Sequence, residues 1–156
     1  MRADPSRRFD PLTSDVLDRL SAIAREDLKA RLGRKPRWQP YADRVVCTVL
    51  CQGAAMHYVD GSTGVKDLDV WTFFSQIEGE PFPHRWATHR RFDRPPFVGH
   101  YVDLMTRSLN VPLEADPLDV IRDYLRAGRT NSARYLARKA AVLLDPPLPR
   151  GHVAWP

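Results

Sequence analysis

The chain contains little cysteine and no long apolar run. Its 156 residues include only two cysteines, Cys47 and Cys51, too few for the disulfide framework of a small secreted protein. Both lie in one apolar segment, which favours buried thiols over a disulfide or a zinc site that would need further ligands. No window approaches the ~20 apolar residues of a membrane span, and no apolar stretch of a secretory signal follows the basic start. We therefore expect a cytoplasmic protein without membrane contact.

Lysine is also scarce, so the positive charge is almost all arginine. The net charge is +5, and lysine stands only at positions 29, 35, 66 and 139. Guanidinium groups bind phosphate through two parallel hydrogen bonds, which suits nucleotide or nucleic-acid partners. A genome of biased base composition would also produce a chain rich in arginine and proline. Charge alone therefore does not choose a partner.

The apolar pattern predicts a single domain over residues 1–156, with residues 1–10 as a flexible arm. Helical spacing over 14–32 is bounded by Ser14 as a cap and Gly33 as a stop. An apolar run over 44–52 predicts a strand buried on both faces, followed by a short helix over 54–59. Further strands are expected over 66–74 and 99–111, and helices over 116–128 and 131–144. The predicted class is α+β, a central mixed sheet with flanking helices.

Residues 78–96 show little periodicity and are long for a connection without structure. They form either a functional loop or short elements that the pattern does not define. Cations and aromatics alternate here, as they do on nucleic-acid-binding surfaces, but a loop packed by its own aromatic side chains is an equal interpretation. The residues concerned are Phe82, Arg85, Trp86, Arg90, Arg91, Phe92 and Arg94.

Three aspartates stand among apolar neighbours. Asp67 and Asp69 are two residues apart at the expected strand over 66–74, so their carboxylates would lie on the same face. Asp103 stands in the middle of the strand expected over 99–111. Like charges this close are unfavourable unless a cation lies between them, and carboxylate oxygens are the ligands that Mg²⁺ and Mn²⁺ prefer. Asp67, Asp69 and Asp103 therefore predict a divalent-metal site if the two strands are neighbours.

These residues, together with Gly53 at the end of the preceding strand, resemble the DNA polymerase β-like nucleotidyltransferase superfamily. The resemblance covers about residues 44–110, the expected catalytic core. It implies that a helix opening at Gly53 cradles a nucleoside triphosphate and that Asp67 and Asp69 bind metal. It also implies that Asp103 helps to deprotonate the attacking hydroxyl. Ala54 departs from the family pattern, which has serine or glycine after the glycine.

The expected activity is metal-dependent transfer of a nucleoside monophosphate from the triphosphate to a hydroxyl. The predicted nucleotide-binding residues are Gly53, Ala54, Lys66 and Arg107, the last on the same strand face as Asp103. The acceptor stays open among nucleic acid, a small molecule and a partner protein. The alternative is a non-catalytic protein that binds a nucleotide, RNA or a partner on the same fold, such as a toxin–antitoxin component. Ala54 favours that alternative, and the three aspartates favour the enzyme.

Overall fold

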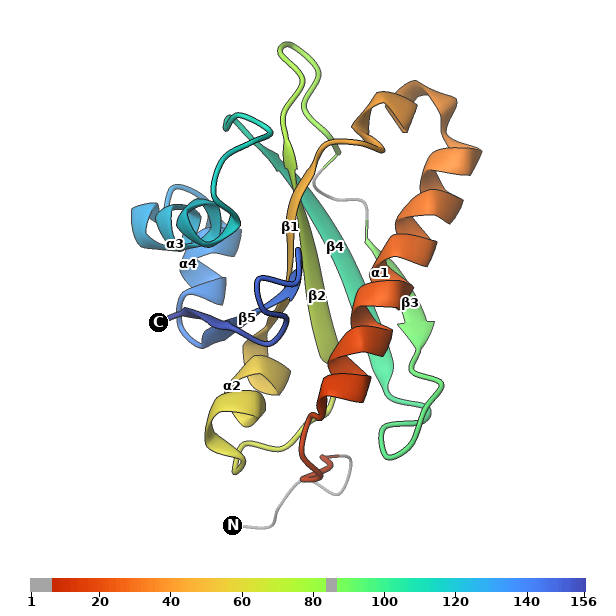
Figure 1. The fold of residues 1–156 in the computed structure, drawn as a ribbon, viewed down its shortest axis with the longest axis vertical. Helices are drawn as coiled ribbons and strands as arrows, with labels where there is room; N and C mark the ends of the chain where they lie inside the picture. The colour runs from red at the N-terminus through yellow and green to blue at the C-terminus, as the bar shows by residue number, and fades with distance from the viewer. Residues whose placement is uncertain (1–6, 84–86) are drawn as a thin grey trace.

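The computed structural model describes residues 7–83 and 87–156, and within these ranges six strands form one sheet with helices on both faces (Figure 1). The helices are α1 (Ser14–Arg34), η1 (Pro36–Tyr41, a 3-10 helix), α2 (Gln52–Asp60), α3 (Pro117–Ala127) and α4 (Asn131–Leu136). The strands are β1 (Val45–Cys51), β2 (Leu68–Ser75), β3 (Thr88–Arg91), β4 (Tyr101–Leu109), β5 (Ala140–Asp145) and β6 (Val153–Trp155). They lie in the order β3-β4-β2-β1-β5-β6. Strands β2 and β4 pair in parallel and the other neighbours are antiparallel, which confirms a mixed sheet in an α+β protein.

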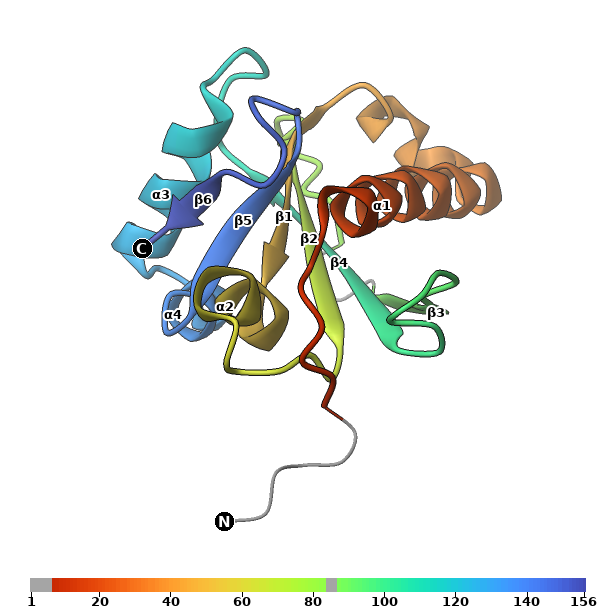
Figure 2. The same ribbon diagram turned by 60° about the horizontal axis from the view of Figure 1, so that its bottom comes forward.

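The two faces of the sheet carry different helices (Figure 2). Alternation along β2 sends Leu68 and Val70 into a core shared with α1 and α2. It sends Trp71 and Phe73 into a second core shared with α3 and α4. Strand β1 is buried along almost its whole length, as its continuous apolar run predicted.

Three of the predicted helices form close to their expected positions. Helix α1 is capped by Thr13, whose hydroxyl accepts from the Val16 N–H, rather than by Ser14. Helix α3 begins after Asp116, whose carboxylate accepts two backbone N–H groups, and ends at Gly128 in the left-handed conformation. Helix α2 is longer than expected because it begins at Gln52, directly after β1.

The helix expected over 131–144 is wrong beyond its first turns. Helix α4 ends at Leu136, and residues Ala140–Asp145 form β5 in the interior of the sheet. The alanines and leucines of this segment fit a helical stripe as well as a strand. Pairing with β1 buries both of its faces, and burial of that kind outweighs intrinsic propensity.

The stretch 78–96 contains an edge strand, β3, which the pattern did not define. Its aromatic residues Phe82 and Phe92 are buried in core clusters formed with other elements, so they belong neither to a nucleic-acid-binding surface nor to a loop packed only by its own aromatics. Arg90 bonds to the buried carboxylate of Asp27 and is not available to nucleic acid through that group. Arg85 and Trp86 lie outside the described residues.

The expected arm over 1–10 is ordered in the part that the structure describes. Arg8 and Val65 exchange two backbone hydrogen bonds of 2.8 Å, and the Phe9 ring packs against Gly64. Residues 1–6 of the predicted arm lie outside the described residues. Among the helices of residues 7–83 and 87–156, none is long and apolar enough to cross a membrane.

Candidate functional site

Two of the predicted metal ligands face each other across neighbouring strands. In the parallel pairing of β2 with β4, Asp69 lies directly opposite Asp103. Both side chains are on the sheet face that also carries Trp71, and both are partly buried. Asp67 precedes the first residue of β2, so it is not within the strand that the spacing predicted. The predicted adjacency of the two strands is therefore confirmed, with Asp67 placed at the approach to β2.

The charges of the three aspartates interact. Burial raises the pKa of Asp69 to about 7, and the neighbouring charges of Asp103 and Asp67 add to that rise. The Asp103 carboxyl group is close enough to share a hydrogen bond with Asp69. Near neutral pH, Asp69 is therefore partly protonated, which reduces its repulsion with the Asp103 carboxylate.

A histidine completes this cluster from the edge strand. His89 lies opposite Asp103 in the pairing of β3 with β4, and its Nδ1 is 2.5 Å from the Asp103 Oδ1. The His89 side chain is 66% exposed, so the imidazole is the solvent-facing side of the cluster. Sequence reasoning missed His89 because the Arg- and His-rich strand β3 lacks the apolar alternation that would have revealed its register.

The turn from β1 into α2 lies beside Asp69. Cys51, the last residue of β1, pairs with Asp69, and the helix begins at the next residue, Gln52. Within the described residues, no side chain caps this helix, so its first N–H groups remain open to an acceptor. The start of a helix carries partial positive charge and favours anions. Gly53 and Ala54, the predicted phosphate-binding residues, are the second and third residues of this helix.

Gln52 is a second residue that the motif did not reveal. Its φ of 61° is in the left-handed region, which costs a residue with a side chain about 1–3 kcal/mol. Its side-chain Nε2 is buried and has no hydrogen-bond partner within residues 7–83 and 87–156. A strained backbone and a buried unsatisfied donor are therefore found together at the start of α2.

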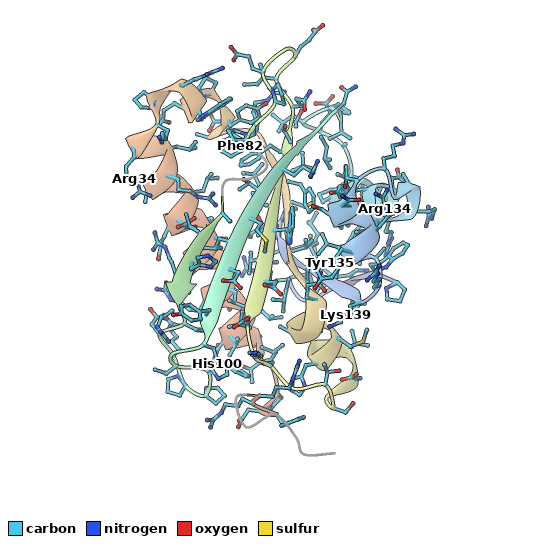
Figure 3. The ribbon with its side chains drawn as sticks, turned by 180° about the vertical axis from the view of Figure 1, so that it is seen from behind. Arg34, Phe82, His100, Arg134, Tyr135 and Lys139 are labelled. Atoms are coloured by element: carbon cyan, nitrogen blue, oxygen red, sulfur yellow. The ribbon has the colours of Figure 1, made fainter. Side chains whose placement is uncertain are left out.

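Two cations reach the site from distant parts of the sequence. The Arg7 guanidinium bonds to the carbonyls of Thr63 and Gly64 and lies 3.8 Å from the position of a Cβ on Gly53. Lys139, just before β5, is close enough to lower the pKa of Asp69, against the larger effects that raise it. Lys139 lies between the end of α4 and the start of β5, outside any helix, although the helix predicted over 131–144 had included it; Figure 3 shows it near Tyr135. No spacing in the sequence connects either residue to the aspartates.

The other predicted binding residues lie around the carboxylates at different distances. Lys66 is exposed next to Asp67, on the wall of a hollow that the two residues share. Arg107 is on the same face of β4 as Asp103, as predicted. It is four residues further along the strand, which places it about 13 Å from Asp103. Its buried Nε has no hydrogen-bond partner in the described part of the chain. Arg107 therefore does not adjoin the Asp69–Asp103 pair.

The remaining predictions concern buried residues. His57 is buried, and both of its ring nitrogens are hydrogen-bonded: Nδ1 accepts from the Gly64 N–H and Nε2 bonds to the Asp10 carbonyl. Both cysteines are free and fully buried, as predicted. Burial raises the pKa of the Cys47 thiol to about 12 and the pKa of Cys51 well above its usual value, so both are unreactive.

The arrangement is not a preformed metal cage. Within residues 7–83 and 87–156, no three or more His, Cys, Asp or Glu side chains are positioned to hold a metal ion together. Carboxylate oxygens are nevertheless the ligands that Mg²⁺ and Mn²⁺ prefer. Burial, with the charges of Asp103 and Asp67, raises the pKa of Asp69 among them. No family of known proteins, no curated protein and no solved structure matches the chain.

Proposed function

We propose that the protein transfers a nucleoside monophosphate from a nucleoside triphosphate to a hydroxyl group, with Mg²⁺ or Mn²⁺ as cofactor. The observation that carries the proposal is the placement of Asp69 opposite Asp103 at the sheet end where α2 begins. Carboxylates and an uncapped helix start at one point provide both a metal site and a phosphate site. This is the arrangement that the resemblance to the polymerase β-like superfamily implies.

The carboxylates of Asp69 and Asp103, with Asp67 at the approach to β2, are the residues that would hold the cation. Their mutual repulsion makes a positive ion at this point favourable. When bound, the cation would orient the triphosphate and neutralise charge on the reacting phosphoryl oxygens.

The triphosphate would lie against the start of α2. The N–H groups of Gly53 and Ala54 and the buried amide of Gln52 are its donors, and Arg7 adds a positive charge on the far side of Gly53. Ala54 lacks the hydroxyl that the family usually offers, so more of the phosphate binding rests on Arg7 and Gln52.

The acceptor hydroxyl would attack the α-phosphorus on the open face of β4. A bond forms from the acceptor oxygen to phosphorus, the bond to the leaving pyrophosphate breaks, and the proton passes to the carboxylate of Asp103. The Asp103–His89 contact gives that carboxylate a partner that faces solvent.

The test measures metal binding and transfer in the same three proteins: the parent chain, Asp69→Asn and Asp103→Asn. We expect calorimetry to show Mn²⁺ binding by the parent in the presence of a non-hydrolysable triphosphate, and loss of binding in both variants. Transfer of label from an α-labelled triphosphate should fall by orders of magnitude in the variants. Glu114→Gln, which changes an exposed carboxylate in a distant loop, is the matched control and should behave as the parent.

Two results would decide against the proposal. Absence of Mn²⁺ binding at millimolar concentration, with and without triphosphate, contradicts the metal site. Triphosphate binding without transfer to any acceptor supports instead the non-catalytic binding protein that Ala54 favours.

Arg7 provides a separate test of the phosphate site. Arg7→Ala should weaken triphosphate binding several-fold, because it removes a charge next to Gly53. Arg8→Ala is the control, since Arg8 is exposed and its side chain bonds to Asp10. Equal affinities of the two variants would place the triphosphate elsewhere.

A further inference from the structure

A shallow hollow of about 400 Å³ lies next to Asp67, beyond the carboxylate cluster. Its walls come from the approach to β2 and from the β3–β4 turn, and they include Lys66, Arg91, Gly99, His100 and Tyr101. Figure 3 shows His100 at the lower end of β4.

Two planar side-chain groups in the hollow, the Arg91 guanidinium and the Tyr101 ring, are held in contact with each other. Arg91 and Tyr101 are opposite each other in the pairing of β3 with β4, and the Arg91 guanidinium lies 4.2 Å from the centre of the Tyr101 ring. The guanidinium also bonds to the Tyr101 hydroxyl and to the Gly99 carbonyl, each at 2.8 Å. Tyr101 nevertheless remains 44% exposed. An aromatic ring held in place and left open to solvent suits a planar ligand.

The charges that line the hollow favour an anion, because two cations, Lys66 and Arg91, outnumber the one carboxylate there, Asp67. Lys66 and Arg91 are both exposed, and His100 fixes the Lys66 backbone by bonding through Nδ1 to its carbonyl at 2.7 Å. Exposed aromatics between cations are how proteins hold single-stranded nucleic acid: bases stack on the ring and phosphates meet the charges. A small acceptor would be enclosed to a greater extent than this open hollow allows.

The hollow also has the correct position relative to the carboxylates. Tyr101 is on the same strand face as Asp103 and two residues away, which is about 6.6 Å along β4. A nucleotide whose base stacks on Tyr101 therefore has its sugar hydroxyls within reach of Asp103. His89 on β3 lies beside both residues, since its ring is edge-on to Tyr101 at 6.4 Å between ring centres and its Nδ1 contacts the Asp103 Oδ1.

We propose that this hollow binds the end of a single-stranded nucleic acid, stacked on the Tyr101–Arg91 pair with its phosphates against Lys66, and presents its terminal hydroxyl to Asp103. The assignment rests on the proposed function for the role of acceptor. The binding itself does not, because it needs neither metal nor triphosphate.

The test is the fluorescence anisotropy of labelled single-stranded oligouridylate and oligodeoxythymidylate, with chelator present and no triphosphate. Tyr101→Ala should weaken binding about tenfold to a hundredfold, whereas Tyr101→Phe should retain most of it. Tyr135→Ala is the matched control: Tyr135 is 58% exposed and lies near an arginine, Arg138, but it is on α4 (Figure 3). The Tyr135→Ala variant should bind the oligomers as tightly as the parent, and a thermal melt checks that each variant folds.

The outcomes separate this proposal from the activity. Equal losses in Tyr101→Ala and Tyr135→Ala, no binding of either oligomer, or equal affinity for duplex and single strands would each overturn the proposed subsite. Oligomer binding that depends on Tyr101, without any nucleotide transfer, would support the subsite and contradict only the proposed function. Whichever oligomer binds more tightly identifies the acceptor as RNA or DNA.

Discussion

Asp69 pairs with Cys51 on one side and faces Asp103 on the other, so water reaches its carboxyl group poorly. Its pKa in the folded chain is about 7, against 3.8 as the ordinary value. Because the folded pKa is raised, the folded chain holds this proton more tightly than the unfolded chain. The resulting stabilisation is complete below pH 3.8 and is lost as the pH rises through 7.

Asp69→Asn removes this pH dependence because the amide stays neutral. With chelator present, the free energy of unfolding of the variant relative to the parent should increase from pH 5 to pH 8. The expected increase is about 3 kcal/mol, since the pH rises by two units between 5 and the folded pKa and one pKa unit corresponds to about 1.4 kcal/mol. Urea denaturation at the two pH values measures it. A variant that is less stable than the parent at pH 8 would show that the Asp69 carboxylate makes stabilising hydrogen bonds.

His57 has a structural role at the residue scale. Its two ring nitrogens join α2 to the Asp10 carbonyl and to the Gly64 N–H, which flank the Arg8–Val65 pair. His57→Ala should lower the free energy of unfolding by about 2–3 kcal/mol, because two partly buried groups lose their partners. Chemical denaturation checks this against His152→Ala, a partly exposed histidine whose substitution should cost less than 1 kcal/mol.

At the scale of elements, the buried carboxylate of Asp27 fixes the edge strand. Asp27 on α1 accepts hydrogen bonds from Thr88 Oγ1 at 2.7 Å and from Arg90 Nε at 3.0 Å, both on β3. It also lies against the buried Arg31 guanidinium at 2.9 Å. Since alternate residues of β3 point to opposite faces, these bonds on one face fix the positions of His89 and Arg91 on the other.

Asp27→Ala should therefore loosen β3 as well as destabilise the protein. Removing one member of a buried ion pair costs about 3–5 kcal/mol, and the backbone amides of β3 should exchange hydrogen faster. Asp18→Ala on the same helix is the control: its carboxylate is 56% exposed and bonds to Arg150, so its loss should cost at most about 1 kcal/mol. Unchanged exchange in β3 would show that pairing with β4 alone holds the strand.

The elements predicted correctly are those whose sequence pattern is compatible with only one type of secondary structure. The run at β1 is too apolar for an edge position, and Asp116 followed by proline and later by Gly128 defines both ends of α3. The sequence of residues 140–144 is compatible with both a helix and a strand, and only its pairing with β1 decides between them. In the site, Asp69 and Asp103 were found because a carboxylate among apolar strand residues is unusual. Arg7, His89 and Lys139 were missed because ordinary surface cations give no such signal.

At the scale of the whole molecule, strands β1 and β2 connect all three clusters of the core. Strand β2 alone contributes Val70 to the first cluster, Phe73 to the second and Phe74 to the third. The third cluster, between η1 and β2, is built on Leu32, Tyr41, Phe74 and Phe82. Because the same two strands supply residues to each cluster, unfolding of one cluster disturbs the strands on which the other clusters pack.

The chain should therefore unfold in one cooperative transition. Trp38 packs against the third cluster and Trp71 lies in the second, so tryptophan fluorescence reports on both, while far-UV circular dichroism reports chiefly on the helices. The two signals should give the same urea midpoint. An earlier fluorescence midpoint would show that the cluster at η1 unfolds independently.

The left-handed backbone of Gln52 has a consequence for how this chain responds to selection. Gln52→Gly would relieve the strain and favour the turn between β1 and α2, at the loss of the amide beside Gly53. A laboratory screen for heat resistance alone would therefore enrich glycine at position 52. On the proposal that this amide binds the triphosphate, a screen for triphosphate binding would retain glutamine at position 52. The residue selected there therefore shows whether stability or binding was under selection.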